Sequence, residues 1–248
     1  MIIEQYPNQE NPNINPELTQ NFIKDSLEKA EKGIYRVEVK IGDKNIPIDV
    51  YPEVFPPKSN YSVSSKSVYE AFGNLEGMVI ADIGTGTGIE SIVAALAGAI
   101  HVDAVDINDM AVECTSHNVE LNGLSDKITV FRGDLFSVLP NKKYNLIIAN
   151  LPIVNFKPDN NSGITGALYD PDFILHIRLF KEAKQFLSEN GIVTLTHANL
   201  QSARTDDPDK DFNDIEKIMI ENDYEIVEKV ESDALGYKWV NYKIKLII

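Results

Sequence analysis

Apolar and polar residues follow one pattern in the first third of the chain and another in the rest. Residues 34–42 and 45–52, "IYRVEVKIG" and "NIPIDVYP", alternate around the turn "GDKN", which predicts a β-hairpin. Residues 16–33 carry apolar side chains at helical spacing, and residues 65–72 predict a second, short helix. We therefore expect residues 1–75 to form an N-terminal extension made of a polar lead, a helix, a hairpin and a Pro-rich loop.

Residues 76–248 show short apolar runs alternating with helical patterns. Strands are predicted at 78–84, 101–107, 127–134, 144–150 and 192–199, and helices at 88–99, 109–123, 173–191 and 212–223. The last two strand patterns, 224–232 and 237–248, leave no room for a helix between them and should pair antiparallel. The predicted fold class is α/β: a Rossmann-like seven-strand mixed sheet, mostly parallel, with a C-terminal antiparallel strand pair.

Composition narrows the range of partners. The 248-residue chain has 38 acidic and 23 basic residues and a net charge of −15, which disfavours nucleic acid because its binders gain affinity from Lys and Arg. No run of about 18 apolar residues and no secretory pattern is present, so we expect no membrane association. The single cysteine, Cys114, excludes an internal disulfide and fits a reducing compartment, so a cytoplasmic protein is expected.

A glycine-rich turn follows the first strand predicted for the sheet. In "ADIGTGTGIE", Gly84, Gly86 and Gly88 allow a tight turn and let the backbone touch a ligand, and Asp82 precedes them. The dinucleotide-binding fingerprint needs a third glycine three residues after the second, where Ile89 stands. A nicotinamide-dependent dehydrogenase is therefore disfavoured, while an ordinary βα turn would also explain the glycines.

Polar residues follow the next three strands as well. Asp106 ends the second strand, where a carboxylate can accept hydrogen bonds from two ribose hydroxyls. Asp134, in "FRGDLF", follows the third strand and can accept from an exocyclic amine such as that of adenine. The segment "NLPI", residues 150–153, follows the fourth strand. These features share the sheet edge where open α/β sheets bind ligands, so together they indicate a site rather than solvated loops.

The segments "VIADIGTGTG", "VDIND", "GDLF" and "IIANLPI" together resemble the class I S-adenosylmethionine-dependent methyltransferases. The most similar branch has an Asn-Pro-Pro-Tyr motif and includes protein N5-glutamine, amino-N6-adenine and guanine-N2 methyltransferases. The segment "IPIDVYPEVFPPKS" is also similar to the hairpin and loop that precede the core of glutamine methyltransferases. The resemblance implies S-adenosyl-L-methionine as cofactor and makes residues 76–248 the domain that binds it.

The resemblance also assigns roles to individual residues. The glycine-rich turn would pass under the methionine part of the cofactor, with Asp82 near its amino group. Asp106 would hold the ribose, Ile107 would pack on adenine, and Asp134 with Leu135 would hold the adenine edge. The expected cofactor-binding residues are Asp82, Gly84, Thr85, Gly86, Asp106, Ile107, Gly133, Asp134, Leu135 and Asn150.

The "NLPI" segment keeps part of the related motif. In that motif the Asn side chain and the carbonyl of the next residue accept hydrogen bonds from the substrate NH group. Asn150 and Leu151 retain these acceptors and Pro152 stiffens the turn by fixing φ, so these three are the expected catalytic residues. Ile153 lacks the aromatic ring that would stack on a flat base. Alternatively, Asn150 only terminates the strand.

The acceptor side of the site is less well defined by sequence. The expected substrate-binding residues are Phe55, Pro56, Tyr61 and Ile153, and residues 155–172 predict a long loop over the acceptor pocket. Methyl transfer from a sulfonium needs alignment, worth about 7–11 kcal/mol, rather than a nucleophilic side chain. No metal site is expected, since the four histidines show no cluster in the sequence, and a structural role is expected for His197.

The leading hypothesis is an S-adenosylmethionine-dependent methyltransferase acting on an acceptor, expected to be nitrogen, of a protein side chain or small molecule. The alternatives are a nucleic-acid base N-methyltransferase and a catalytically silent cofactor-binding subunit.

Overall fold

The computed structural model describes residues 24–25, 28–29, 33–57, 62–158 and 163–247. Its main sheet contains β3 (Val79–Ile83), β4 (His101–Asp106), β5 (Ile128–Arg132), β6 (Tyr144–Ala149), β7 (Leu187–Ala198), β8 (Tyr224–Ala234) and β9 (Tyr237–Leu246). A separate hairpin consists of β1 (Tyr35–Ile41) and β2 (Lys44–Val50). The helices are α2 (Ser64–Glu70), α3 (Ile89–Leu96), α4 (Asp109–Leu121), the 3-10 turn η1 (Pro171–Phe173), α5 (Ile174–Ala183) and α6 (Lys210–Glu221).

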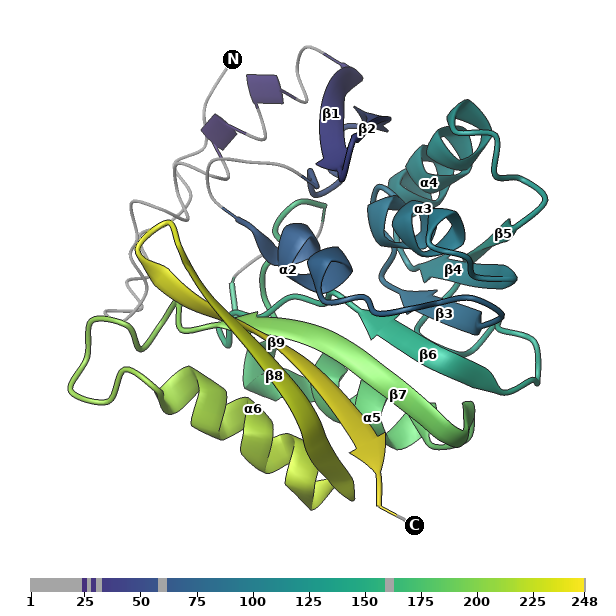
Figure 1. Ribbon diagram of the computed structural model, residues 1–248. Helices are drawn as coiled ribbons and strands as arrows, with labels where there is room; N and C mark the ends of the chain where they lie inside the picture. The colour runs from purple at the N-terminus through teal and green to yellow at the C-terminus, as the bar shows by residue number, and fades with distance from the viewer. Residues whose placement is uncertain (1–23, 26–27, 30–32, 58–61, 159–162, 248) are drawn as a thin grey trace.

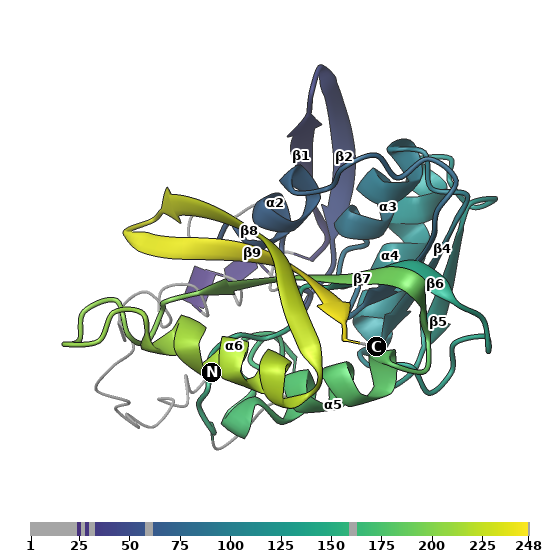
Figure 2. The same ribbon diagram turned by 60° about the horizontal axis from the view of Figure 1, so that its bottom comes forward.

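The seven strands lie in the order β5-β4-β3-β6-β7-β9-β8, and helices cover both faces of the sheet (Figure 1). The pairs from β5 to β7 are parallel, while β9 runs antiparallel to β7 and β8. Figure 2 shows α2, α3, α4 and the hairpin on one face and α5 and α6 on the other. The chain order reverses between β3 and β6, the position at which open α/β sheets bind ligands. The predicted fold class is confirmed.

The central strands supply both layers of the core. Along β6, Leu146 and Ile148 belong to the cluster under α3 and the hairpin, whereas Ile147 belongs to the cluster under α5 and α6. This division follows from the alternation of side chains along a strand and explains why the strand is apolar from Leu146 to Ala149. Among the helices described, none is both long and apolar enough to cross a bilayer.

Two predicted helices differ from the structure or lie partly outside the described residues. The helix predicted over 173–191 ends at Ala183, and β7 begins at Leu187 rather than 192, because the Tyr144 N–H donates to the carbonyl of Phe186 and the Phe186 ring stacks on Phe136. The apolar pair at 186–187 therefore serves the sheet and core instead of a helix. Most of the helix predicted over 16–33 lies outside the described residues, of which 24–25 and 28–29 are helical.

His197, on β7, is buried among aromatic rings. Its ring centroid lies 5.8 Å from that of Phe173 and 6.1 Å from that of His176, so two histidines that are distant in the sequence lie together. The ring is fully buried, and neither nitrogen has a hydrogen-bond partner in the described part of the chain. Burial, with the nearby His176, lowers the pKa of His197 to about 3.

This lowered pKa predicts a specific acid sensitivity. A neutral His197 stabilises the fold above its ordinary pKa of 6.5, and that stability is lost as the pH falls toward 3. At about pH 5 the loss is roughly 2 kcal/mol. In His197→Leu the drop in unfolding free energy between about pH 7 and pH 5 should shrink by that amount, measured by urea denaturation. The same drop in both proteins would contradict the prediction.

Candidate cofactor and acceptor site

A cavity of about 810 Å³ lies at the carboxyl edge of the sheet. That volume falls in the range of small-molecule sites, roughly 300–1,000 Å³. One side of the cavity is formed by the turns after β3, β4 and β5, and the other by the segment after β6, the start of α2 and the long loop before η1. Its lining includes Glu53, Phe55, Ser64, Ser65, Gly84, Thr85, Gly86, Thr87, Glu90, Asp106, Ile107, Gly133, Asp134, Leu135, Asn150, Leu151, Pro152, Ile153, Gly166, Arg178, Leu200 and Trp239.

The glycine-rich turn is held against the end of β4. The N–H groups of Gly84 and Thr85 both donate to the carbonyl oxygen of Val105, at 2.9 and 3.0 Å. Gly84 has φ +75°, and a Cβ there would lie 3.1 Å from the Leu151 Cδ2 atom. Glycine is therefore required at this position by both conformation and contact, and it brings the backbone to the cavity.

Asp106 is anchored by the backbone. One carboxylate oxygen accepts from the Gly86 N–H at 3.0 Å and the other from the Asn108 N–H at 2.9 Å. Burial raises the pKa of Asp106, while these backbone donors oppose the shift. Each oxygen retains a lone pair, so the group can accept hydrogen bonds from a pair of ligand hydroxyls.

Asp82 lies beneath the turn and not in the cavity lining. Its carboxylate accepts from the hydroxyls of Thr85, at 2.8 Å, and Ser91. Burial raises the pKa of Asp82 to about 6. The structure thus gives Asp82 a supporting contact to the turn, and its predicted approach to a ligand amino group stays a prediction.

Asp134 is paired with a residue that sequence reasoning missed. Arg178, on α5, donates from Nη1 to Asp134 Oδ1 at 3.1 Å and lies 3.0 Å from Oδ2 through Nη2. Arg178 also bonds to Glu182 one turn later. This fork fixes the plane of the Asp134 carboxylate at the cavity wall. No local sequence signal joins two residues 44 positions apart.

Asn150 is held by its amino group. Its Nδ2 donates to Glu90 Oε1 at 2.8 Å and lies 3.3 Å from Ser65 Oγ and 3.5 Å from Ser64 Oγ. No donor to its Oδ1 is found among the described residues. Asn150 therefore presents an acceptor oxygen that has no protein partner in this part of the chain.

Glu90 is a buried carboxylate in the first turn of α3, and sequence reasoning missed it too. It is 4% exposed and lines the cavity. Burial raises the pKa of Glu90 to about 7, and the nearby charge of Asp82 acts in the same direction. The signal was present: the helix "IESIVAAL" is apolar except at Glu90 and Ser91, and an unpaired acid in such a helix is unusual.

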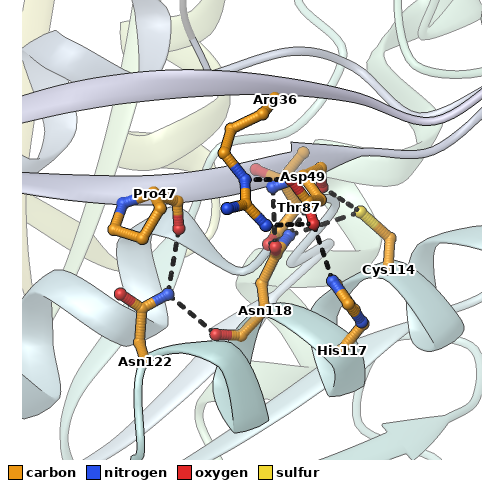
Figure 3. A network of polar contacts seen from close by, with 8 residues as sticks. All are labelled: Arg36, Pro47, Asp49, Thr87, Cys114, His117, Asn118 and Asn122. Atoms are coloured by element: carbon orange, nitrogen blue, oxygen red, sulfur yellow. Dashed lines mark hydrogen bonds and ion pairs between the residues drawn. The ribbon is translucent and has the colours of Figure 1, made fainter.

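A polar network ties the N-terminal hairpin to the glycine-rich turn (Figure 3). Asn118, on α4, donates from Nδ2 to the carbonyls of Asp49 and Thr87 at 2.8 and 2.9 Å, and its Oδ1 accepts from the Asp49 N–H at 2.8 Å. The Asp49 carboxylate accepts from Arg36 at 2.6 Å, and this guanidinium lowers the pKa of Asp49 to about 2. His117 bonds to the same carboxylate. One amide therefore links β2, α4 and the turn.

Most of the predicted site residues line the cavity. All predicted cofactor-binding residues except Asp82 line the cavity, as do the predicted catalytic residues Asn150, Leu151 and Pro152. Phe55 and Ile153 line it on the acceptor side, whereas Pro56 is buried outside the lining and Tyr61 falls outside the described residues. Their roles as ligand contacts stay predictions. Trp239, on β9, is 1% exposed yet contributes to the lining.

Asn118→Leu tests the network. Leu is similar in size, but it leaves the Asp49 N–H and the Thr87 carbonyl without partners and the Asp49 carbonyl with the Cys114 thiol alone, so we expect a loss of about 2–4 kcal/mol in the free energy of unfolding. Urea denaturation measures the loss. Ser116→Ala, on the exposed side of the same helix, is the matched control and should change the value by less than about 0.5 kcal/mol. Equal effects of the two substitutions would contradict the role given to Asn118.

The central part of the chain is similar to known methyltransferases. Residues 66–163 match the family model described as "Ribosomal protein L11 methyltransferase (PrmA)". A ribosomal protein L11 methyltransferase of Desulforamulus reducens is 43% identical over 82 residues, 31% of this chain and 26% of that protein. A ribosomal protein uL3 glutamine methyltransferase of Bordetella pertussis is 33% identical over 125 residues, 46% of this chain and 41% of that protein. The chain therefore spans less than half of these relatives.

Solved structures extend the likeness over most of the chain. The ribosomal protein L11 methylase of Lactobacillus delbrueckii subsp. bulgaricus has a TM-score of 0.54 at 24% identity, covering 74% of this chain and 76% of that one. A tRNA m1G37 methyltransferase of Methanocaldococcus jannaschii has a TM-score of 0.58 at 22% identity, covering 86% of this chain and 55% of that one. The resemblance to class I S-adenosylmethionine-dependent methyltransferases is confirmed. Because these two neighbours are named for different acceptors, the fold alone does not select one.

Proposed function

We propose that this chain is a methyltransferase that moves the methyl group of S-adenosyl-L-methionine to a nitrogen of a protein side chain or small molecule. The observation that carries the proposal is Asn150. Its amino group is held by Glu90, and its oxygen is left as an acceptor in the wall of a cavity that the glycine-rich turn also lines. An acceptor oxygen there can hold an N–H group of the substrate in line with the reactive methyl.

The residues lining the other side of the cavity suit the cofactor. Asp106 offers carboxylate lone pairs to ribose hydroxyls, and Asp134 offers them to the adenine amine. Ile107 is 62% exposed although it lines the cavity, as an apolar side chain would be if it covered one face of a flat ring. The turn at Gly84–Gly86 brings the backbone close, and Asp82 supports it from below. When bound, the cofactor supplies an electrophilic methyl on a sulfonium.

The chemistry asks little of the protein beyond alignment. The acceptor nitrogen forms a bond to the methyl carbon as the carbon–sulfur bond breaks, and its N–H proton leaves. Asn150 and the carbonyl of Leu151 would orient that N–H, and Pro152 would limit movement of the segment. The side chain of Leu151 is buried against Gly84, so packing holds its backbone in place of the second proline ring of the related motif.

The charge of the cavity favours a neutral or cationic acceptor. Glu53 and Glu90 line it in addition to the carboxylates of the cofactor side, and Arg178, the basic side chain that the described residues contribute to the lining, is already paired with Asp134. A phosphate backbone would meet repulsion here. The relatives named for ribosomal proteins L11 and uL3 support a protein side chain as acceptor. We assign residues 1–75 to the acceptor side and 76–248 to the cofactor, and a buried free Cys114 suits a cytoplasmic enzyme.

Calorimetry tests the cofactor. S-adenosylmethionine and its demethylated product should bind with micromolar dissociation constants, and Asp106→Ala should weaken binding about ten- to hundredfold, because a buried acceptor for two hydroxyls is lost. Glu113→Ala removes the same charge from the exposed face of α4 and serves as the control. Circular dichroism verifies folding. Binding of NAD but of neither methyl compound would refute the proposal.

Asn150→Ala tests the transfer step. The variant should lose at least about a hundredfold in kcat, since alignment of the nitrogen is lost, while its affinity for the cofactor stays within about threefold of wild type. Transfer of labelled methyl to ribosomal proteins and to small amides and amines is the measurement. Full activity of the variant would refute the role of Asn150. Cofactor binding without transfer to protein, metabolite or nucleic-acid acceptors would identify a silent subunit instead.

A further inference from the structure

Glu90 is a buried acid for which stability offers no explanation. Within the described residues Glu90 forms no ion pair, and the charged group that acts on it, Asp82, has the same sign. Burying an unpaired carboxylate is costly, and an aliphatic side chain would suit the otherwise apolar α3 better. Its hydrogen-bond partners, Asn150 and Ser65, both line the cavity. These contacts connect Glu90 to the acceptor side of the site.

The carboxylate determines which way the Asn150 amide faces. An ionised carboxylate only accepts hydrogen bonds, so the Asn150 amino group must face Glu90 at 2.8 Å, and the carbonyl oxygen is turned to the opposite side. Without Glu90 the serine hydroxyls could donate to Oδ1 or accept from Nδ2, and both orientations of the amide would be satisfied. The Glu90 carboxylate thus fixes the orientation of the Asn150 amide, which the serine hydroxyls alone would leave undetermined.

We propose that Glu90 is a positioning residue that holds the Asn150 amide with its oxygen toward the acceptor, and so selects acceptors that bring an N–H donor. The inference rests on the proposed function and narrows it: an amide or amine nitrogen can donate to Asn150 Oδ1, whereas a carbon acceptor, or a deprotonated oxygen, offers it no hydrogen. Glu90 acts through Asn150 and takes no part in bond making.

Protonation of Glu90 should weaken this control. A protonated carboxyl can donate to Asn150 Oδ1, so the amide can turn over. The titratable groups that interact electrostatically with Glu90 are Asp82 from β3 and Tyr69 from α2. Because the pKa of Glu90 lies at about 7, turnover should rise as the pH increases through that value.

Two variants test the positioning role. Glu90→Gln keeps the size of the side chain but, like the protonated acid, can also donate to Asn150 Oδ1, so kcat should fall to the level that wild type shows at acid pH and should not rise near neutral pH. Glu90→Leu should lower kcat about ten- to hundredfold with little change in cofactor affinity. The control is Asp103→Asn, at a buried carboxylate of β4 that bonds to Tyr144 and lies outside the lining; its kcat should match wild type.

Wild-type turnover preserved in Glu90→Leu would overturn the proposal, and so would a rise of kcat near neutral pH that persists in Glu90→Gln. A readout without turnover keeps the inference separate from the proposed function. The Asn150 side-chain amide signals of ¹⁵N-labelled protein, assigned with Asn150→Ala, should shift as the pH passes about 7 in wild type and not in Glu90→Gln. Signals that do not respond to pH in wild type would refute the contact even in a chain that transfers no methyl group.

Discussion

Several carboxylates crowd the carboxyl edge of the sheet, and the fold has to hold them with few cations. Asp82, Glu90 and Asp106 form no ion pair in the described part of the chain; each is held by hydroxyl, amide or backbone N–H donors. Nearby like charges raise one another's pKa and disfavour the compact state. The groups that donate hydrogen bonds to these carboxylates therefore have to lie on segments that other contacts hold in place. The donors come from the glycine-rich turn and from Ser91, Asn108 and Asn150. The hydrogen bonds that make the buried charges tolerable therefore also set the geometry of the cavity.

The N-terminal extension belongs to this arrangement rather than being attached to it. The Asn118 amide joins the hairpin to the carbonyl of Thr87, and the start of α2 brings Ser64 and Ser65 to the amide of Asn150. The extension contributes Glu53, Phe55, Ser64 and Ser65 to the cavity wall, and the network in Figure 3 ties the hairpin to the glycine-rich turn. Substitutions in the hairpin should thus alter the position of the glycine-rich turn, although no hairpin residue needs to contact a ligand.

Sequence patterns predicted the sheet and one side of the site because both depend on local signals. Alternating strand and helix patterns determine topology, and residues at the ends of parallel strands meet at one edge whatever the rest of the chain does. Glu90 and Arg178 were missed since their importance lies in contacts across the fold, to Asn150 and Asp134. The early start of β7 at Leu187 was missed because an apolar pair suits a helix, a strand or a core equally well until its partners are known.

The departures of "NLPI" from its related motif have structural counterparts. Leu151 replaces a rigid ring by packing its side chain under Gly84, and that contact is available only because residue 84 lacks a Cβ. Ile153 brings no aromatic surface, but Trp239 from β9 and Phe55 from the extension both line the cavity. Two other elements thus place aromatic side chains at the cavity, and the segment keeps the hydrogen-bond acceptors of Asn150 and Leu151. A flat, uncharged group with an N–H donor, such as a side-chain amide, is complementary to these aromatic side chains and acceptors. A nucleotide is also flat, but it carries a phosphate that the surrounding carboxylates repel.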